Sequence, residues 1–208
     1  MMNLRILLAR HGQTAANAEK RFQGRLDCPL NEEGHRQAVR LAHLLVRWQP
    51  GRLYTSDLSR SIATARPAAQ LLGVEPVASP VFGEYSWGVL EGLTWPEIKK
   101  DYPVLFSKLR HNHIRAEIPE QEPLHEFRQR LKQGLALLLD KGGPSVVALV
   151  GHGRYLNALV VDFLGLDFNG PWPFSFASAA VTVLEDSGGR RRLLTFNEEC
   201  HLTGENDA

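Results

Sequence analysis

The sequence predicts a single α/β domain in which a mostly parallel central sheet carries helices on both faces. Short apolar runs of strand length alternate with longer segments whose apolar residues recur at helical spacing. This alternation favours a parallel sheet, because each crossover helix covers one face of the strands that it joins. Hydrophobic residues make up 43% of the chain and charged residues 23%, as in ordinary globular domains. The 208 residues show no internal repeat or low-complexity segment, so we expect one domain over residues 1–208.

The first half of the chain contains three expected strands. The apolar run Arg5–Ala9 predicts a buried strand, and the glycine turn at Gly12 follows it. Glu33–Trp48 carries apolar residues at helical spacing, and Pro50-Gly51 ends that helix. The next expected elements are a strand at Leu53–Thr55, a helix at Arg60–Leu72 capped by Asp57 or Ser59 and ended by Gly73, and a strand at Val74–Ala78.

The second half begins with an irregular stretch at residues 80–122, in which only Trp95–Arg110 has a helical pattern. A connection of this length is typical of a lid or an insertion that carries function, so we expect it to lie over the active site. The elements that follow are a helix at Leu124–Lys141, a strand at Val146–Val150, a helix at Tyr155–Leu164, and a hairpin of Ala179–Leu184 and Arg192–Phe196 around Ser187-Gly188-Gly189.

The charge balance excludes a strongly basic or acidic protein. Lys plus Arg number 24 and Asp plus Glu number 23, so we expect no nucleic-acid or membrane partner. Cys28 and Cys200 are too few for a disulfide framework and suit a reducing compartment. The Leu4–Ala9 run is too short for a signal segment or a membrane span. We therefore expect a cytoplasmic protein, either a monomer or a homodimer.

Several known motifs fail on inspection. Gly151–Leu156 begins like a dinucleotide fingerprint but lacks its third glycine, and His125-Glu126 lacks the second zinc ligand because position 129 is Gln129. No phosphate-binding Gly-Lys-Ser/Thr occurs, neither cysteine is followed by an arginine six positions later, and no Asp-x-Asp motif follows a strand. We interpret His111 and His113 as solvent-facing residues of the 80–122 stretch, not as metal ligands.

Four cationic or potentially cationic residues follow the expected strands. Arg10 and His11 come after the first strand, Arg60 opens the helix after the second, and His152 follows Val146–Val150. Ligands of open α/β sheets bind at the carboxyl ends of the strands, near helix N-termini that favour anions. One such residue alone is usually a solvated turn residue. Four of them at equivalent strand ends indicate an anion site despite the neutral total charge.

Four ordered blocks of sequence carry a family resemblance. They are Leu7–Thr14 with Asn17, Phe22-Gln23-Gly24 and Asp27-x-Pro29-Leu30; Tyr54–Arg60 with Thr64-Ala65; Gly83-Glu84 with Gly88 and Glu91-Gly92; and Val150–Gly153. In these blocks, which lie within residues 4–157, the chain resembles the histidine phosphatase superfamily, the phosphoglycerate mutase-like proteins. Arg-His-Gly alone is a weak signal, but four blocks in this order are a specific one.

The resemblance implies a role for each residue that matches one of the family's motifs. His11 is expected to be the nucleophile that forms a phosphohistidine, with its other ring nitrogen bonded to a carbonyl near Gly12. Arg10 and Arg60 would bind the non-bridging phosphate oxygens. Glu84 would protonate the leaving alcohol and then activate water. His152 would add a further donor, and Asn17, Gln23, Gly24 and Gly153 would line the substrate site. No metal or other cofactor is implied, and the expected ligand is a small phosphorylated metabolite.

The resemblance leaves the reaction open between hydrolysis and phosphoryl transfer. Family mutases carry Arg-His-Tyr after the general acid and Trp after Phe-x-Gly, where this chain has Tyr85-Ser86-Trp87 and Arg25. These differences favour a metal-independent phosphatase. The alternatives are a cofactor-dependent phosphoglycerate mutase and a non-catalytic member that binds phosphorylated ligands. Related phosphatases often have Gly-Glu-Ser where this chain has Gln121-Glu122-Pro123, so the contact made by that loop stays open.

Six aromatic residues have two interpretations. They could form an apolar pocket for the leaving group, or they could pack in the core as large aromatics commonly do. The six are Trp87, Trp95, Phe106, Trp172, Phe174 and Phe176.

Overall fold

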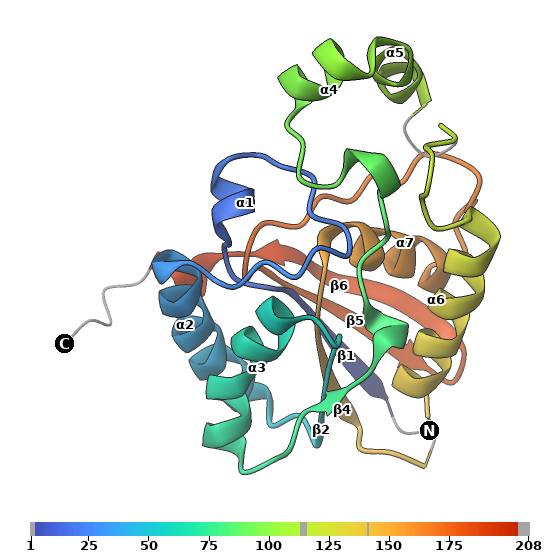
Figure 1. Ribbon diagram of the computed structural model, residues 1–208. Helices are drawn as coiled ribbons and strands as arrows, with labels where there is room; N and C mark the ends of the chain where they lie inside the picture. The colour runs from blue at the N-terminus through green and yellow to red at the C-terminus, as the bar shows by residue number, and fades with distance from the viewer. Residues whose placement is uncertain (1–2, 113–115, 141, 204–208) are drawn as a thin grey trace.

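The computed structural model describes residues 3–112, 116–140 and 142–203. They form one six-stranded sheet of order β3-β2-β4-β1-β5-β6 (Figure 1). The first four strands of this order run parallel to their neighbours, whereas β5 is antiparallel to both β1 and β6. The strands are β1 Leu4–Arg10, β2 Arg52–Thr55, β3 Val77–Ala78, β4 Val146–Gly151, β5 Val181–Ser187 and β6 Arg190–Glu198. The expected α/β class and mostly parallel sheet are confirmed.

Helices cover both faces of the sheet, as Figure 1 shows. On β1, the side chains of Ile6 and Leu8 pack in one apolar cluster with residues of α6 (Leu124–Leu138) and α7 (Gly153–Phe163). Leu7 points to the opposite face, in a cluster with residues of α2 (Glu32–Trp48) and α3 (Ser59–Leu72). Neighbouring residues of a strand point to opposite faces, so this apolar run fills two cores at once.

The observed elements differ from the expected ones in length and capping. β3 covers Val77–Ala78, not Val74–Ala78, and the short helix α1, Ala15–Ala18, was not expected. The expected cap of α3 by Asp57 or Ser59 is wrong, because Leu58 occupies the cap position without a side-chain hydrogen bond. The carboxylate of Asp27 instead accepts the N–H of Ser59 at 2.8 Å. A residue remote in sequence thus performs the capping.

The 80–122 insertion lies above the carboxyl ends of the parallel strands (Figure 1). Its helices are η1 Pro80–Phe82, η2 Gly88–Leu90, α4 Trp95–Asp101 and α5 Pro103–Asn112; a last short helix, η3 Cys200–Leu202, follows β6. A small apolar cluster of its own holds the insertion together: Leu90, Ile98, Leu109, Ala116 and Ile118. The expectation that His111 and His113 face the solvent lies outside the described part of the chain, which includes neither residue 113 nor the side chain of His111.

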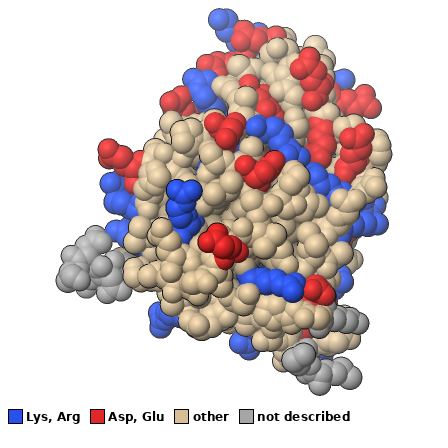
Figure 2. Space-filling model, turned by 60° about the horizontal axis from the view of Figure 1, so that its bottom comes forward, with Lys and Arg blue, Asp and Glu red and all other residues tan. Residues whose placement is uncertain are grey.

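Positive and negative side chains are interspersed on the face of the molecule shown in Figure 2. This distribution agrees with the formal net charge of +1. Within the described part of the chain, no helix is both long and apolar enough to cross a membrane.

Candidate active site

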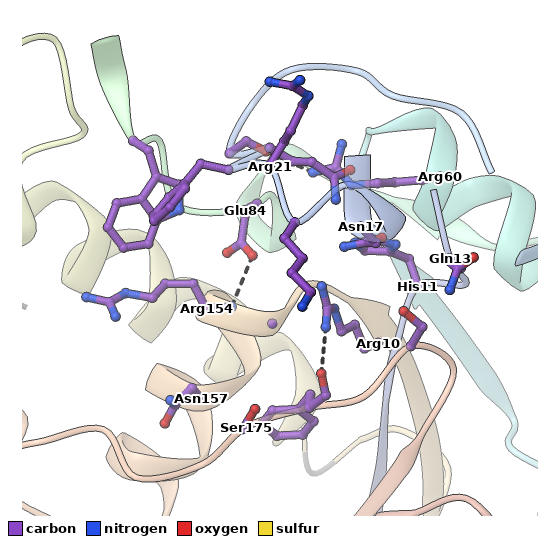
Figure 3. A pocket seen from close by; sticks show the side chains of 18 of the residues that line it. Arg10, His11, Gln13, Asn17, Arg21, Arg60, Glu84, Arg154, Asn157 and Ser175 are labelled. Atoms are coloured by element: carbon purple, nitrogen blue, oxygen red, sulfur yellow. Dashed lines mark hydrogen bonds between the residues drawn. The ribbon is translucent and has the colours of Figure 1, made fainter. Parts of the chain in front are cut away.

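A cavity of about 530 Å³ lies at the carboxyl end of β1, between the 80–122 insertion and the N-terminus of α7. Figure 3 shows the side chains that line it. The expected catalytic residues Arg10, His11, Arg60 and Glu84 all line this cavity. The topology therefore brings together residues that are up to 74 positions apart in sequence, from 10 to 84.

His11 is held at the end of β1 in one orientation. Its side chain is buried, and the ring Nδ1 lies 2.7 Å from the carbonyl oxygen of Gly12, as the sequence analysis expected. Because a carbonyl only accepts, Nδ1 carries the hydrogen and the lone pair is on Nε2. Burial lowers the pKa of His11 well below 6.5, and the nearby charges of Arg10 and Arg60 lower it further. The ring is therefore neutral and nucleophilic at neutral pH.

The loop after His11 is fixed by close backbone packing. A Cβ on Gly12 would lie 2.5 Å from the carbonyl oxygen of Gly34 in the first turn of α2, so only glycine fits. The N–H of Gly12 donates to Thr64 Oγ1 at 2.9 Å, and the same hydroxyl donates to the carbonyl of Arg60 at 2.7 Å. Thr64 thus connects the His11 loop to the helix that carries Arg60.

The two arginines of the site are partly committed to carbonyl groups, and Arg10 is half-buried. Arg10 donates from Nη1 to the carbonyl of Phe176 at 2.7 Å. Arg60 is fully buried and donates to the carbonyls of Leu26 at 2.7 Å and Gly24 at 2.8 Å. The Nε atoms of both arginines are buried without a hydrogen-bond partner. Desolvation lowers the pKa of both guanidinium groups below its usual value.

His152 lies beside His11 but does not line the cavity itself. It is fully buried at the end of β4, and the two ring centroids are 5.2 Å apart. Its Nε2 is hydrogen-bonded to the hydroxyl of Ser56 at 2.7 Å, whereas its Nδ1 has no partner. Burial lowers the pKa of His152 well below 6.5, and the charge of Arg60 adds to this effect. Buried polar atoms without a partner in the protein are suited to bind an anionic ligand.

Glu84 is attached to the N-terminus of α7. Its Oε1 accepts the backbone N–H groups of Tyr85 at 2.8 Å and Tyr155 at 2.9 Å, and its Oε2 accepts that of Arg154 at 3.0 Å. The N-terminus of a helix favours a negative charge, so α7 fixes the position of the carboxylate. Glu84 is 9% exposed, at the wall of the cavity.

Arg130 of α6 holds the segment that precedes Glu84, and the sequence analysis missed it. Its guanidinium donates to the carbonyls of Val81 at 3.0 Å and Gly83 at 2.7 Å. It also forms an ion pair with Glu122 at 2.8 Å, in which both side chains are largely buried. Glu122 is the middle residue of Gln121-Glu122-Pro123, where this chain has the same Glu as the Gly-Glu-Ser of related phosphatases, and through Arg130 it supports the Glu84 loop from behind.

The expected substrate-binding residues Asn17, Gln23, Gly24 and Gly153 also line the cavity. Of the six aromatic residues, Trp87, Phe174 and Phe176 line it, whereas Trp95 and Phe106 pack against each other in the insertion and Trp172 packs in the main core. Three of the six therefore line the cavity and could contact a leaving group, which stays a prediction, and the other three pack in apolar clusters. Among the described residues, no three His, Cys, Asp or Glu side chains gather in a group that could hold a metal ion.

Further cavity residues were not expected: Gln13, Lys20, Arg21, Phe22, Arg154, Asn157, Ser175 and Ser178. Arg154 directly follows the Gly151-His152-Gly153 motif, so its place in the site could have been inferred from that position. Asn157 lies one turn further along α7 and bonds the carbonyl of Trp172 at 2.9 Å, which fixes the segment that carries Phe174 and Phe176. The others lie in segments without a periodic pattern.

Comparisons with known proteins give consistent results. A sequence profile of the histidine phosphatase superfamily (branch 1) matches residues 6–199. The chain is 34% identical over 163 residues to the probable phosphoglycerate mutase GpmB of Cronobacter sakazakii, covering 78% of this chain and 76% of that protein. It is 28% identical over 199 residues to phosphoserine phosphatase 1 of Hydrogenobacter thermophilus, covering 96% and 94%. The structure of a mycobacterial glucosyl-3-phosphoglycerate phosphatase in complex with VO3 is similar, with a TM-score of 0.85, 30% identity and coverage of 94% and 99%.

Proposed function

Because the chain belongs to branch 1 of the histidine phosphatase superfamily, we propose that it is a metal-independent phosphatase that hydrolyses small phosphate monoesters through a phosphohistidine on His11. The observation that carries this proposal is a buried, neutral imidazole beside the half-buried Arg10 and the fully buried Arg60, at the carboxyl end of a parallel strand. Relatives named as phosphatases for phosphoserine and for glucosyl-3-phosphoglycerate support a small phosphorylated substrate.

In the first step, the lone pair on Nε2 of His11 attacks phosphorus and forms an N–P bond while the ester P–O bond breaks. The Gly12 carbonyl favours this step, because it binds the Nδ1–H that becomes more acidic as positive charge develops on the ring. Glu84 gives its proton to the departing alkoxide, so that the leaving group is a neutral alcohol.

In the second step, water replaces the imidazole on phosphorus. Glu84, now ionised, takes a proton from that water, the N–P bond breaks, and inorganic phosphate is formed. His11 regains its neutral form with Nδ1–H still directed at Gly12. Atoms and protons therefore balance over the two steps without any co-reactant besides water.

Charge on the transferring phosphoryl group is offset by fixed cations. Arg10 and Arg60 supply the positive charge and present buried Nε groups that have no partner, and the neutral His152 adds a buried Nδ1 in the same state. Preorganised donors of this kind stabilise a transition state without reorganisation during the reaction. The Ser56 hydroxyl contact at 2.7 Å holds the His152 ring in place for this role.

The test is a panel of phosphate monoesters assayed in a metal chelator, with phosphoglycerate isomerisation measured in parallel. We expect phosphate release that the chelator leaves unchanged, and an acid-labile phosphoenzyme trapped on His11. His11→Asn is expected to abolish both signals. His43→Asn, which changes an exposed histidine of α2, is the matched control.

Either of two results would refute the proposal. One is phosphate release at the wild-type rate from a folded His11→Asn protein. The other is activity lost on chelation and restored by one divalent ion. Isomerisation faster than phosphate release would favour the mutase alternative, for which the similarity to GpmB is the supporting observation.

A further inference from the structure

The cavity carries more positive charge than a phosphoryl group requires. Five Lys and Arg residues line it, whereas Glu84 is its one lining carboxylate among the residues that the structure describes. Arg10 and Arg60 lie with His11 at the phosphoryl end. Two of the remaining cations are Lys20, whose side chain is exposed to solvent, and Arg21, which is paired with Glu19 at 2.7 Å and Glu97 at 2.8 Å. The fifth, Arg154, is half-buried in the cavity wall.

Arg154 lies on the side from which the leaving group departs. Its backbone N–H donates to Oε2 of Glu84, the residue that protonates the leaving oxygen. In Figure 3, Glu84 lies between Arg154 on one side and His11 and Arg60 on the other. A substrate whose phosphoryl group binds at His11 therefore extends its alcohol part past Glu84 toward Arg154.

The guanidinium of Arg154 is held by aromatic rings. Its central carbon lies 4.6 Å from the ring centroid of Trp172, 4.9 Å from that of Trp87 and 5.7 Å from that of Tyr85. Contact of this kind uses the faces of the guanidinium and fixes its plane, whereas hydrogen bonds to an anion form along the edges of that plane. The rings are themselves held in place: Trp172 donates from Nε1 to the carbonyl of Phe168 at 2.9 Å.

The burial of Arg154 increases its effect on an anion. Desolvation lowers its pKa to about 10, so the group is still protonated at neutral pH. A charge in a poorly solvated place interacts more strongly with an opposite charge than one in water.

We propose that Arg154 binds a carboxylate on the alcohol part of the substrate, so that the enzyme prefers phosphate esters of hydroxyl-bearing carboxylic acids to esters of neutral or cationic alcohols. A planar guanidinium with fixed orientation matches a carboxylate in a bidentate manner. This inference rests on the proposed phosphatase function and adds the substrate class to it.

The experiment compares two substrate pairs that differ in the carboxylate. O-phosphoserine is paired with phosphoethanolamine, and 3-phosphoglycerate with glycerol 3-phosphate. In the wild-type enzyme we expect the kcat/KM ratio within each pair to favour the carboxylate-bearing member. Arg154→Gln should lower that ratio about 10- to 100-fold, as expected when a charge-assisted hydrogen bond is lost. The change should appear mostly in KM, because the carboxylate is bound equally in the ground and transition states.

Two further variants separate charge from packing. Arg154→Lys keeps the charge and should restore part of the ratio. Arg128→Gln is the matched control, because Arg128 also stacks on an aromatic ring, that of Phe168 at 4.7 Å, but does not line the cavity. Its ratio should equal that of the wild type.

The wild-type ratio tests the inference even if a variant fails to fold. A ratio near one for both pairs would overturn it, as would an Arg154→Gln enzyme that loses activity equally on both members of each pair. Hydrolysis of other monoesters of the panel but of none of these four would also overturn the inference, whereas failure on the whole panel would refute the proposed phosphatase function.

Discussion

Replacing Arg130 by methionine is expected to destabilise the protein and slow the reaction together. Arg130 donates to the carbonyls of Val81 and Gly83 and forms an ion pair with Glu122. The side chains of the pair are only 14% and 13% exposed, so the substitution leaves a buried carboxylate without its partner. Removing one partner of such a pair costs about 3–5 kcal/mol, which for a domain of this size lowers Tm by about 6–20 °C.

The assay is urea unfolding followed by circular dichroism, with Arg52→Met as the matched control. Arg52 forms an ion pair with Asp140 at 2.9 Å, almost the same distance, but its side chains are 40% and 48% exposed. Surface pairs contribute about 0–1 kcal/mol, so the control should remain close to the wild type. The two variants therefore compare the loss of two ion pairs that have nearly the same length but differ in burial.

The kinetic part of the prediction follows from the position of Glu84. Without the Arg130 contacts, the 81–84 segment loses the donors that fix it, and misplacement of a catalytic group by about 1 Å can cost about 100-fold in rate. Equal losses of unfolding free energy in Arg130→Met and Arg52→Met would refute the reasoning. A destabilised Arg130→Met enzyme with an unchanged kcat would remove Arg130 from the positioning of Glu84 and leave it a purely structural residue.

Three further predictions concern the site itself. Glu84→Gln should slow esters of alkyl alcohols far more than nitrophenyl phosphate, since nitrophenolate leaves without a proton; equal losses on both substrates in steady-state assays would contradict the general-acid role. Gly12→Ala should reduce kcat/KM and lower Tm, because its Cβ would meet the carbonyl of Gly34 at 2.5 Å; wild-type values for both would show that the loop can shift freely. Burial lowers the folded pKa of His11 and His152 below 6.5, so below that pH the unfolded chain binds more protons than the folded one. The free energy of unfolding then keeps its full value above pH 6.5 and falls on acidification by up to about 1.4 kcal/mol per pH unit for each histidine. Urea unfolding between pH 7.5 and 5.5 should show a smaller change of this free energy with pH in His11→Asn than in the wild type. An identical change in both proteins would contradict this prediction.

The layered fold could be predicted because its signals are local. The apolar run of β1 and that of β4 are buried on both faces, which gives continuous hydrophobic strands, and α2 carries the 3.6-residue period of a half-buried helix. The closing hairpin was visible from Gly188 and Gly189, which both adopt positive φ.

Features set by contacts between remote residues could not be predicted. The cap of α3 comes from Asp27, which is 32 positions away from the N–H of Ser59 that it binds, and no local pattern records such a pair. Helix α1 spans only four residues, too few for a periodic signal, and depends on the Thr14 capping box. Arg130 has the spacing of an ordinary helix residue, and only the tertiary structure places it behind Glu84.

The same distinction divides the cavity into two parts with different sequence signals. Arg10 and His11 are fixed by the end of β1, and Arg60 by α3, so their positions follow from the sheet that the sequence predicts. Arg154 depends on a stack of rings from the insertion and from the segment after α7. The proposed nucleophile and the two arginines beside it are thus attached to the sheet and its crossover helices. The proposed general acid Glu84 lies in the insertion, and the side chain of Arg154, although α7 carries it, is held by rings of the surrounding loops. We therefore expect substitutions in those loops to change the preferred alcohol without moving His11.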